Sequence, residues 1–86
     1  MSKDWNTARE ELKDALAKQK KSLEYHRKAL DVFTNARDSM NENTSERTAD
    51  IIEQAVLRET RNVKSLERNI RDIERDLKTK YSLAVA

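Results

Sequence analysis

The chain has 86 residues, of which 40% are charged and 5% aromatic, and it contains no glycine, proline or cysteine. This length allows one domain, and the lack of glycine and proline argues against a fold with many tight β-turns. The formal net charge of +2 favours no class of partner by itself. The composition is typical of long helices, so the sequence predicts an all-α protein.

The sequence shows no targeting signal. No apolar run follows the first residues, Met1 to Trp5, and no stretch approaches the ~20 apolar residues of a membrane span. The lack of cysteine is compatible with a reducing compartment. We therefore expect a cytoplasmic protein.

A first helix is expected over about residues 3–40, with Ser2 or Asp4 as its cap. Its apolar stripe has alternating spacings of four and three residues, which is a coiled-coil pattern. The members of this stripe are Trp5, Arg9, Leu12, Leu16, Gln19, Leu23, His26, Leu30, Phe33, Arg37 and Met40. Trp5 is expected to close the open end of the structure, against Ala84 and Tyr81.

A turn is expected over about residues 41–46, the only cluster of small polar residues in the chain. Asn43 and Glu46 resemble a capping box, and Thr44 or Ser45 could cap instead. The alternative is one unbroken helix of ~80 residues. After the turn, a second helix is expected over about 47–82. Its stripe comprises Ala49, Ile52, Val56, Glu59, Val63, Leu66, Ile70, Ile73, Leu77, Lys80 and Ala84.

The two stripes form one seam when the helices are folded antiparallel. The expected apolar pairs are Leu12 with Leu77, Leu16 with Ile73, Leu23 with Leu66, and Phe33 with Val56. On one side of the seam, Lys13 is expected to face Glu74 and Lys20 to face Glu67. On the other side, Ala8, Ala15, Ser22, Ala29 and Ala36 recur every seven residues. The sequence therefore predicts a single domain, 1–86, folded as a long antiparallel two-helix hairpin.

Apolar residues near the turn lie off the seam and predict a contact surface. They are Tyr25, Ala29, Val32, Ala36, Ile51 and Leu57. Through this surface a second copy would convert two hairpins into a four-helix bundle. The surface could instead serve a different protein, or the residues could be scattered exposed apolar residues of no special role. The architecture is similar to that of small helical-hairpin dimers of the Rop type, at the level of fold alone.

The seam contains a polar pair, His26 and Glu59, about one helical turn apart. Two interpretations stay open: a buried pair that fixes register or senses pH, and a pair at a solvated edge of a narrow seam.

A basic ridge follows the second helix at spacings of three and four. It comprises Arg61, Lys64, Arg68, Arg71, Arg75 and Lys78. The ridge could follow a nucleic-acid backbone. Against this, Glu67 and Glu74 lie four residues before Arg71 and Lys78 and could quench it, which favours a solvated helix face.

Chemistry of other kinds has little support in the sequence. One histidine and no cysteine leave no ordinary zinc spacing, and no glycine-rich phosphate loop is present. We expect no enzyme activity, cofactor, metal or small-molecule substrate. The sequence favours a protein-interaction module, such as an adaptor, inhibitor or small structural or accessory protein. Its partner would be another protein, a second copy, or both. A nucleic-acid-binding hairpin is the alternative.

Overall fold

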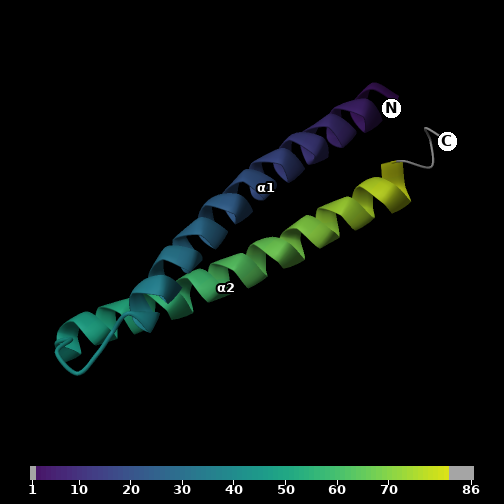
Figure 1. Ribbon diagram of the computed structural model, residues 1–86. Coiled ribbons are helices and arrows are strands. Elements are labelled where there is room, and N and C mark those ends of the chain that lie inside the picture. The colour runs from purple at the N-terminus through teal and green to yellow at the C-terminus, as the bar shows by residue number, and fades with distance from the viewer. Residues whose placement is uncertain (1, 82–86) are drawn as a thin grey trace.

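The computed structural model describes residues 2–81, with side chains from residue 4 onward. Helix α1 spans Ser2–Asp38 and helix α2 spans Glu46–Asp76, followed by a five-residue π-helix, η1, over Leu77–Tyr81. The helices fold back on each other, so that the start of α1 and the end of η1 lie at the same end of the molecule (Figure 1). The all-α hairpin is thus confirmed, and the alternative of one unbroken helix is wrong.

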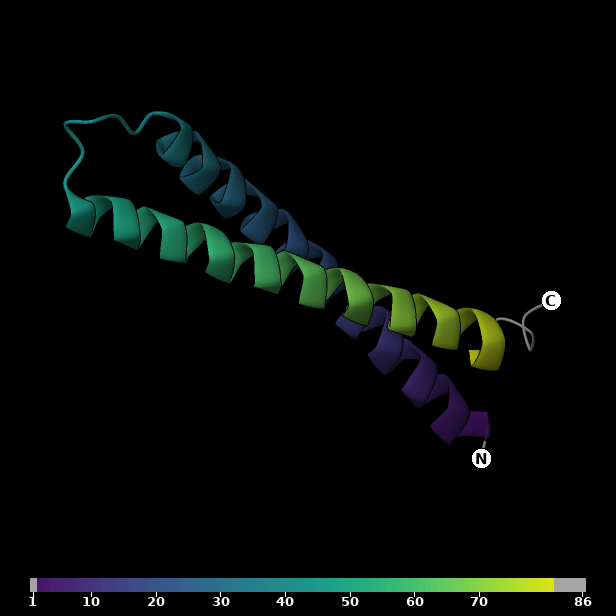
Figure 2. The same ribbon diagram turned by 90° about the horizontal axis from the view of Figure 1, so that it is seen from below.

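The hairpin is long and thin, with extents of 64 × 17 × 14 Å. The two helices cross at an angle, as the second view makes clear (Figure 2). With only one partner helix each, α1 and α2 can bury one narrow stripe, and their other faces remain open to contacts with other molecules.

The loop between the helices covers residues 39–45, slightly earlier than the expected turn. The Asn41 side chain accepts a hydrogen bond from the Asn43 backbone N–H, and the Thr44 hydroxyl accepts one from the Asn41 N–H. Ser45 caps α2 by accepting from the Thr48 N–H at 3.1 Å. No described residue has a positive φ, so this loop needs no glycine.

The seam predicted from the sequence is confirmed along both helices. Every described member of the two stripes is buried or half-buried except Lys80, and Ala84 lies outside the described residues. The buried residues among those described are Ala55, Val56, Glu59 and Ile70. Three of these four lie in the half of α2 nearest the turn, where the small side chain of Ala55 permits close approach of the backbones.

The cross-helix ion pairs differ from the expected ones by one heptad. Glu74 contacts Lys20 at 3.5 Å instead of Lys13, and Glu67 contacts Arg27 at 2.9 Å instead of Lys20. Side chains on a helix lean toward its N-terminus. In this antiparallel pair, Lys20 lies nearer than Glu74 to the turn, so the Lys20 side chain leans away from the turn and the Glu74 side chain leans toward it, and the two meet. Lys13 lies on the other side of Glu74, so the side chains of Lys13 and Glu74 lean away from each other.

The open end of the hairpin is closed by an aromatic contact. The rings of Trp5 and Tyr81 lie 5.4 Å apart between centroids and are tilted by 47°. Tyr81 is the last residue of η1, so the wider π-helical turn ends at this contact. The expected contact of Trp5 with Tyr81 is confirmed, while its other expected neighbour, Ala84, is outside the described part of the chain.

Candidate interaction surfaces

One side of the hairpin is built from small residues next to the seam and large apolar residues outside them. We call it the small face and define it by Ala29, Ala36 and Ala55 beside the seam and by Tyr25, Val32 and Ile51 further out. The three large side chains are 69%, 63% and 59% exposed, respectively. The small face therefore has small side chains along its middle, next to the seam, and large exposed apolar side chains on either side of them.

A groove of about 470 Å³ runs along the small face. Its lining includes Tyr25, Val32 and Phe33 from α1, together with Arg58 and Glu59 from α2. Ile51 lies seven residues before Arg58 and so faces the same side of α2. The sequence analysis missed Arg58, although its seven-residue spacing from Ile51 could have placed it here. Its guanidinium lies 6.0 Å from the centre of the Phe33 ring.

Leu57 does not belong to the small face. It is 47% exposed, but it follows Ala55 by two residues, which turns it by about 200° around the helix. Leu57 lies instead seven residues before Lys64, in line with the basic ridge. Five of the six residues expected to form one contact surface therefore share a side of the hairpin, and Leu57 is separate from them.

All six residues of the basic ridge are exposed. Glu67 and Glu74, which were expected to pair within α2, contact Arg27 and Lys20 of α1. Arg75 pairs with Asp72 at 3.5 Å and approaches Asp76 at 3.9 Å. Four ridge cations make no ion pair with any residue that the structure describes. These four are Arg61, Lys64, Arg68 and Arg71.

The polar pair in the seam is formed. The Glu59 carboxylate, which is only 6% exposed, accepts a hydrogen bond from Nδ1 of His26 at 2.5 Å. The ring of Tyr25 lies edge-on to His26, with centroids 5.2 Å apart. Arg58 approaches the second carboxylate oxygen of Glu59 at 3.5 Å. The interpretation as a solvated pair therefore fails for Glu59, whose carboxylate is enclosed, while the side chain of His26 keeps 27% of its surface exposed.

The environment of Glu59 favours its ionised form. The hydrogen bond from His26 lowers the pKa of Glu59 below its ordinary value of 4.5, and it outweighs burial, which raises the pKa. The charge of His26 and hydrogen bonds from Asn62 and Arg58 lower the pKa further. The carboxylate is thus held between the helices by several donors, which suits a group that fixes their register.

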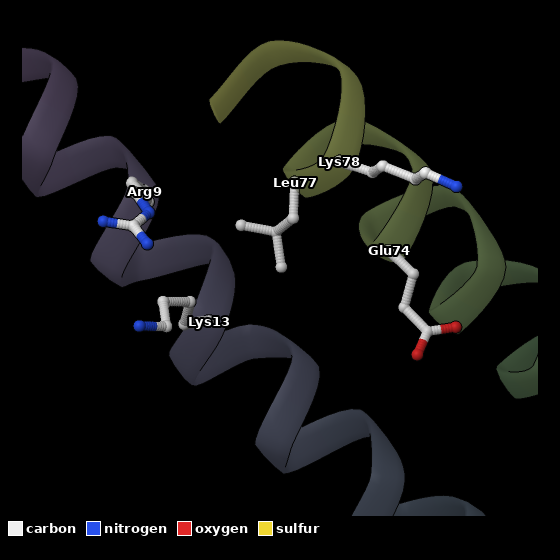
Figure 3. A pocket seen from close by; sticks show the side chains of 5 residues that line it. All are labelled: Arg9, Lys13, Glu74, Leu77 and Lys78. Carbon is white, nitrogen blue, oxygen red and sulfur yellow. The ribbon is translucent and has the colours of Figure 1, made fainter. Parts of the chain in front are cut away.

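The opposite side of the hairpin is charged, and we call it the charged face. It contains the cross-helix ion pairs of Lys20 and Arg27, and Lys13 lies on the same side of α1, where it pairs with Glu10 at 3.7 Å. Near the open end, this face has a groove of about 300 Å³ lined by Arg9, Lys13, Glu74, Leu77 and Lys78. In Figure 3, Leu77 points toward α1, whereas the Lys13 and Lys78 ammonium groups point away from each other. Their charges do not converge on one point, so the groove is not a built anion site.

The described residues contain no group of three or more His, Cys, Asp or Glu side chains that could hold a metal ion. Neither long helix, over the residues described, combines the length and apolar character needed to cross a membrane. Comparisons with protein-family models, with curated proteins and with solved structures found no match.

Proposed function

We propose that this chain is a non-enzymatic protein-interaction module that acts through its small face. In this proposal the first occupant of the face is a second copy of the chain, and the pair forms a four-helix bundle. Such a bundle would give each helix a second neighbour and would cover the apolar residues that a single hairpin leaves in water.

The observation that carries the proposal is the exposure of Tyr25, Val32 and Ile51 on one side of the hairpin, where Tyr25 and Val32 also line a groove. Single exposed apolar residues are ordinary, but a cluster of them on one side of a protein, beside a groove, is typical of a contact surface. The narrow seam adds a second argument, because two helices alone bury little apolar area and a dimer would increase it.

The test is the solution mass of the protein, measured by light scattering across a range of concentrations. We expect the unmodified chain to show twice its chain mass of 10.1 kDa. Val32→Glu places a charge among the exposed apolar residues of the small face, so we expect that variant to run as a monomer.

Leu57→Glu is the matched control, because Leu57 is also exposed and apolar but lies on the ridge side of α2. We expect this variant to keep the mass of a dimer. Circular dichroism checks that both variants remain helical. If the dimer survives Val32→Glu but is lost in Leu57→Glu, the dimer contact lies on the ridge side of α2, and the proposal for the small face is wrong.

A second candidate function is nucleic-acid binding along the basic ridge. It is favoured by the four ridge cations without an ion-pair partner among the described residues. One of them, Arg71, was expected to pair with Glu67, which contacts Arg27 of α1 instead. These four cations lie within eleven residues of α2, Arg61 to Arg71, and extend over about 15 Å. They could follow the phosphates of one strand.

A salt titration separates the two functions. Binding of a labelled DNA or RNA duplex through four phosphates would fall steeply with salt, with a logarithmic slope of about −3 to −4. Reversing the charges of Arg68 and Arg71 should abolish it, while reversing Lys18 and Lys21 on α1 should not. No binding at low salt would remove this second candidate and leave the small face as the functional surface.

A further inference from the structure

Folding the chain back on itself separates charge along the hairpin. The turn half, residues 22–62, carries eight acidic and six basic side chains, a formal charge of −2. The open half, residues 2–21 and 63–81, carries eight acidic and twelve basic side chains, a formal charge of +4. Because these halves lie at opposite ends of a molecule 64 Å long, the hairpin has a charge dipole along its axis.

Two symmetric arrangements could place a second copy on the small face. If the twofold axis runs along the hairpin, the two turns lie side by side, and each charged half meets its like. If the axis runs across the hairpin, the turn of each copy lies beside the open half of the other. The first arrangement brings two −2 halves together and two +4 halves together, whereas the second brings opposite charges together.

We propose that the second copy binds the small face in the antiparallel orientation, with each turn against the partner's open half. The inference rests on the self-association proposed above and specifies its geometry. The midpoint of the small face on α1 lies between Ala29 and Val32. A twofold axis there places residue 18 of one copy near residue 42 of the other.

The charges at these two positions match. Lys18 is exposed and lies seven residues before Tyr25, so it faces the same side of α1. Glu42 is exposed in the loop. The cations nearest the axis are each beside a carboxylate: Lys28 contacts Glu24 at 3.1 Å and Arg58 contacts Glu59 at 3.5 Å. Each of these cations is therefore neutralised by a carboxylate of its own chain, so the cations of the two copies repel each other little.

The overlap is large enough for a specific interface. From residue 18 to residue 42 the two copies would overlap by at most about 36 Å along the hairpin axis, because residues 39–42 lie in the loop and do not rise as a helix. With a hairpin width of 17 Å, this is at most roughly 600 Å² on each copy, or about 1,200 Å² in total, at the lower end of the range for specific interfaces.

Cysteine cross-linking tests the orientation, because the chain contains no cysteine of its own. Ser22→Cys and Ser39→Cys change no charge, and both positions are exposed. Within one chain they are about 25 Å apart along the helix. The antiparallel dimer brings Ser22 of one copy next to Ser39 of the other, whereas the parallel dimer brings each position near itself.

Equal amounts of the two single-cysteine proteins are mixed, allowed to exchange, and treated with a bis-maleimide that spans about 10 Å. The expected product is the mixed dimer of Ser22→Cys with Ser39→Cys, with each protein alone giving little product. Cross-linking of Ser39→Cys to itself would overturn the proposed orientation. A chain that is monomeric by light scattering would overturn the self-association itself. A dimer that forms without any of these cross-links would overturn the orientation alone.

Charge reversal gives an independent reading. In a twofold dimer the Lys18–Glu42 pair occurs twice, and each pair at the rim of the interface contributes about fivefold, so Lys18→Glu should raise the dimer dissociation constant about 25-fold. Adding Glu42→Lys to it should restore the original value, because the two charges are then exchanged. A dissociation constant that does not change in Lys18→Glu, or is not restored in the double variant, would overturn the proposed pairing.

Discussion

The two long faces of the hairpin are built on opposite principles. On the small face, alanines beside the seam are flanked by exposed apolar side chains, and the charges in the groove are held by neighbours. On the charged face, long cations and carboxylates reach across the seam and pair at 2.9 and 3.5 Å. The same two helices therefore present one side suited to close packing and another suited to water.

This difference shows how a thin fold can specify both its register and its free surface. Exposed ion pairs contribute little stability, so the charged face selects which residues meet rather than holding the helices together. Close approach of the backbones depends on the small residues, which in turn leave a low groove. The charged face thus contributes mainly to register, whereas the small face provides both the close packing and the surface that remains available for contact.

The largest expected effect comes from filling the small face. Ala55 is 3% exposed, so Ala55→Leu must push the helices apart and should lower the free energy of unfolding by about 1–3 kcal/mol. Ala17→Leu, at an exposed position of α1, should change it by less than about 0.5 kcal/mol. Urea unfolding followed by circular dichroism measures both. Equal effects in the two variants would show that the helices do not approach closely at Ala55.

A smaller effect is expected from the buried carboxylate in the groove wall. Glu59→Gln keeps the shape but removes the charge that His26 binds, and should cost about 1–2 kcal/mol at pH 7. Because folding lowers the pKa of Glu59, its stabilising contribution is complete above the unfolded pKa, near 4.5, and is lost as the pH falls through the lower folded value.

The measurement is the unfolding free energy between pH 7 and pH 3. The unmodified protein should lose stability more steeply below pH 5 than Glu59→Gln does. Asp50→Gln, which removes an exposed carboxylate near the start of α2, is the comparison for an acid without such partners. Parallel pH profiles for all three proteins would show that Glu59 is not held by His26.

The smallest effect concerns the charged face and tests the one-heptad offset. Glu74→Lys should cost about 0.2–1 kcal/mol, as for other exposed ion pairs. Adding Lys20→Glu should recover this loss, because Lys20 is the observed partner. Adding Lys13→Glu should recover none of it. If Lys13→Glu recovered the loss instead, Glu74 would pair with Lys13, as the sequence analysis expected, and not with Lys20.

Much of the fold follows from the spacing of apolar residues, and particular residues show where this information ends. The stripes locate the seam because periodicity fixes which side of a helix each residue occupies. The spacing of residues along the sequence does not show that long side chains lean toward the N-terminus of their helix. For this reason the observed partners of Glu67 and Glu74 lie seven residues further along α1 than the expected ones. Nor could the spacing choose among the caps, where Ser45 was selected over Asn43 by loop geometry.

The candidate surface was predicted less completely than the fold. Tyr25, Val32 and Ile51 are exposed, as their positions off the seam indicated. Leu57 was grouped with them by nearness in sequence, although its angle around α2 places it on the ridge side. The enclosure of Glu59 required the actual approach of the two backbones, which no one-dimensional pattern contains.

The contact between Trp5 and Tyr81 gives the molecule an internal optical reporter. Trp5 is the only tryptophan in the chain, and it lies at the end of the hairpin that is furthest from the loop. The fluorescence of Trp5 therefore reports whether the two helices are in contact at the open end of the hairpin. Far-ultraviolet circular dichroism instead averages over the whole length of both helices. Comparing the two signals during heating would distinguish fraying that starts at the open end from a single concerted transition.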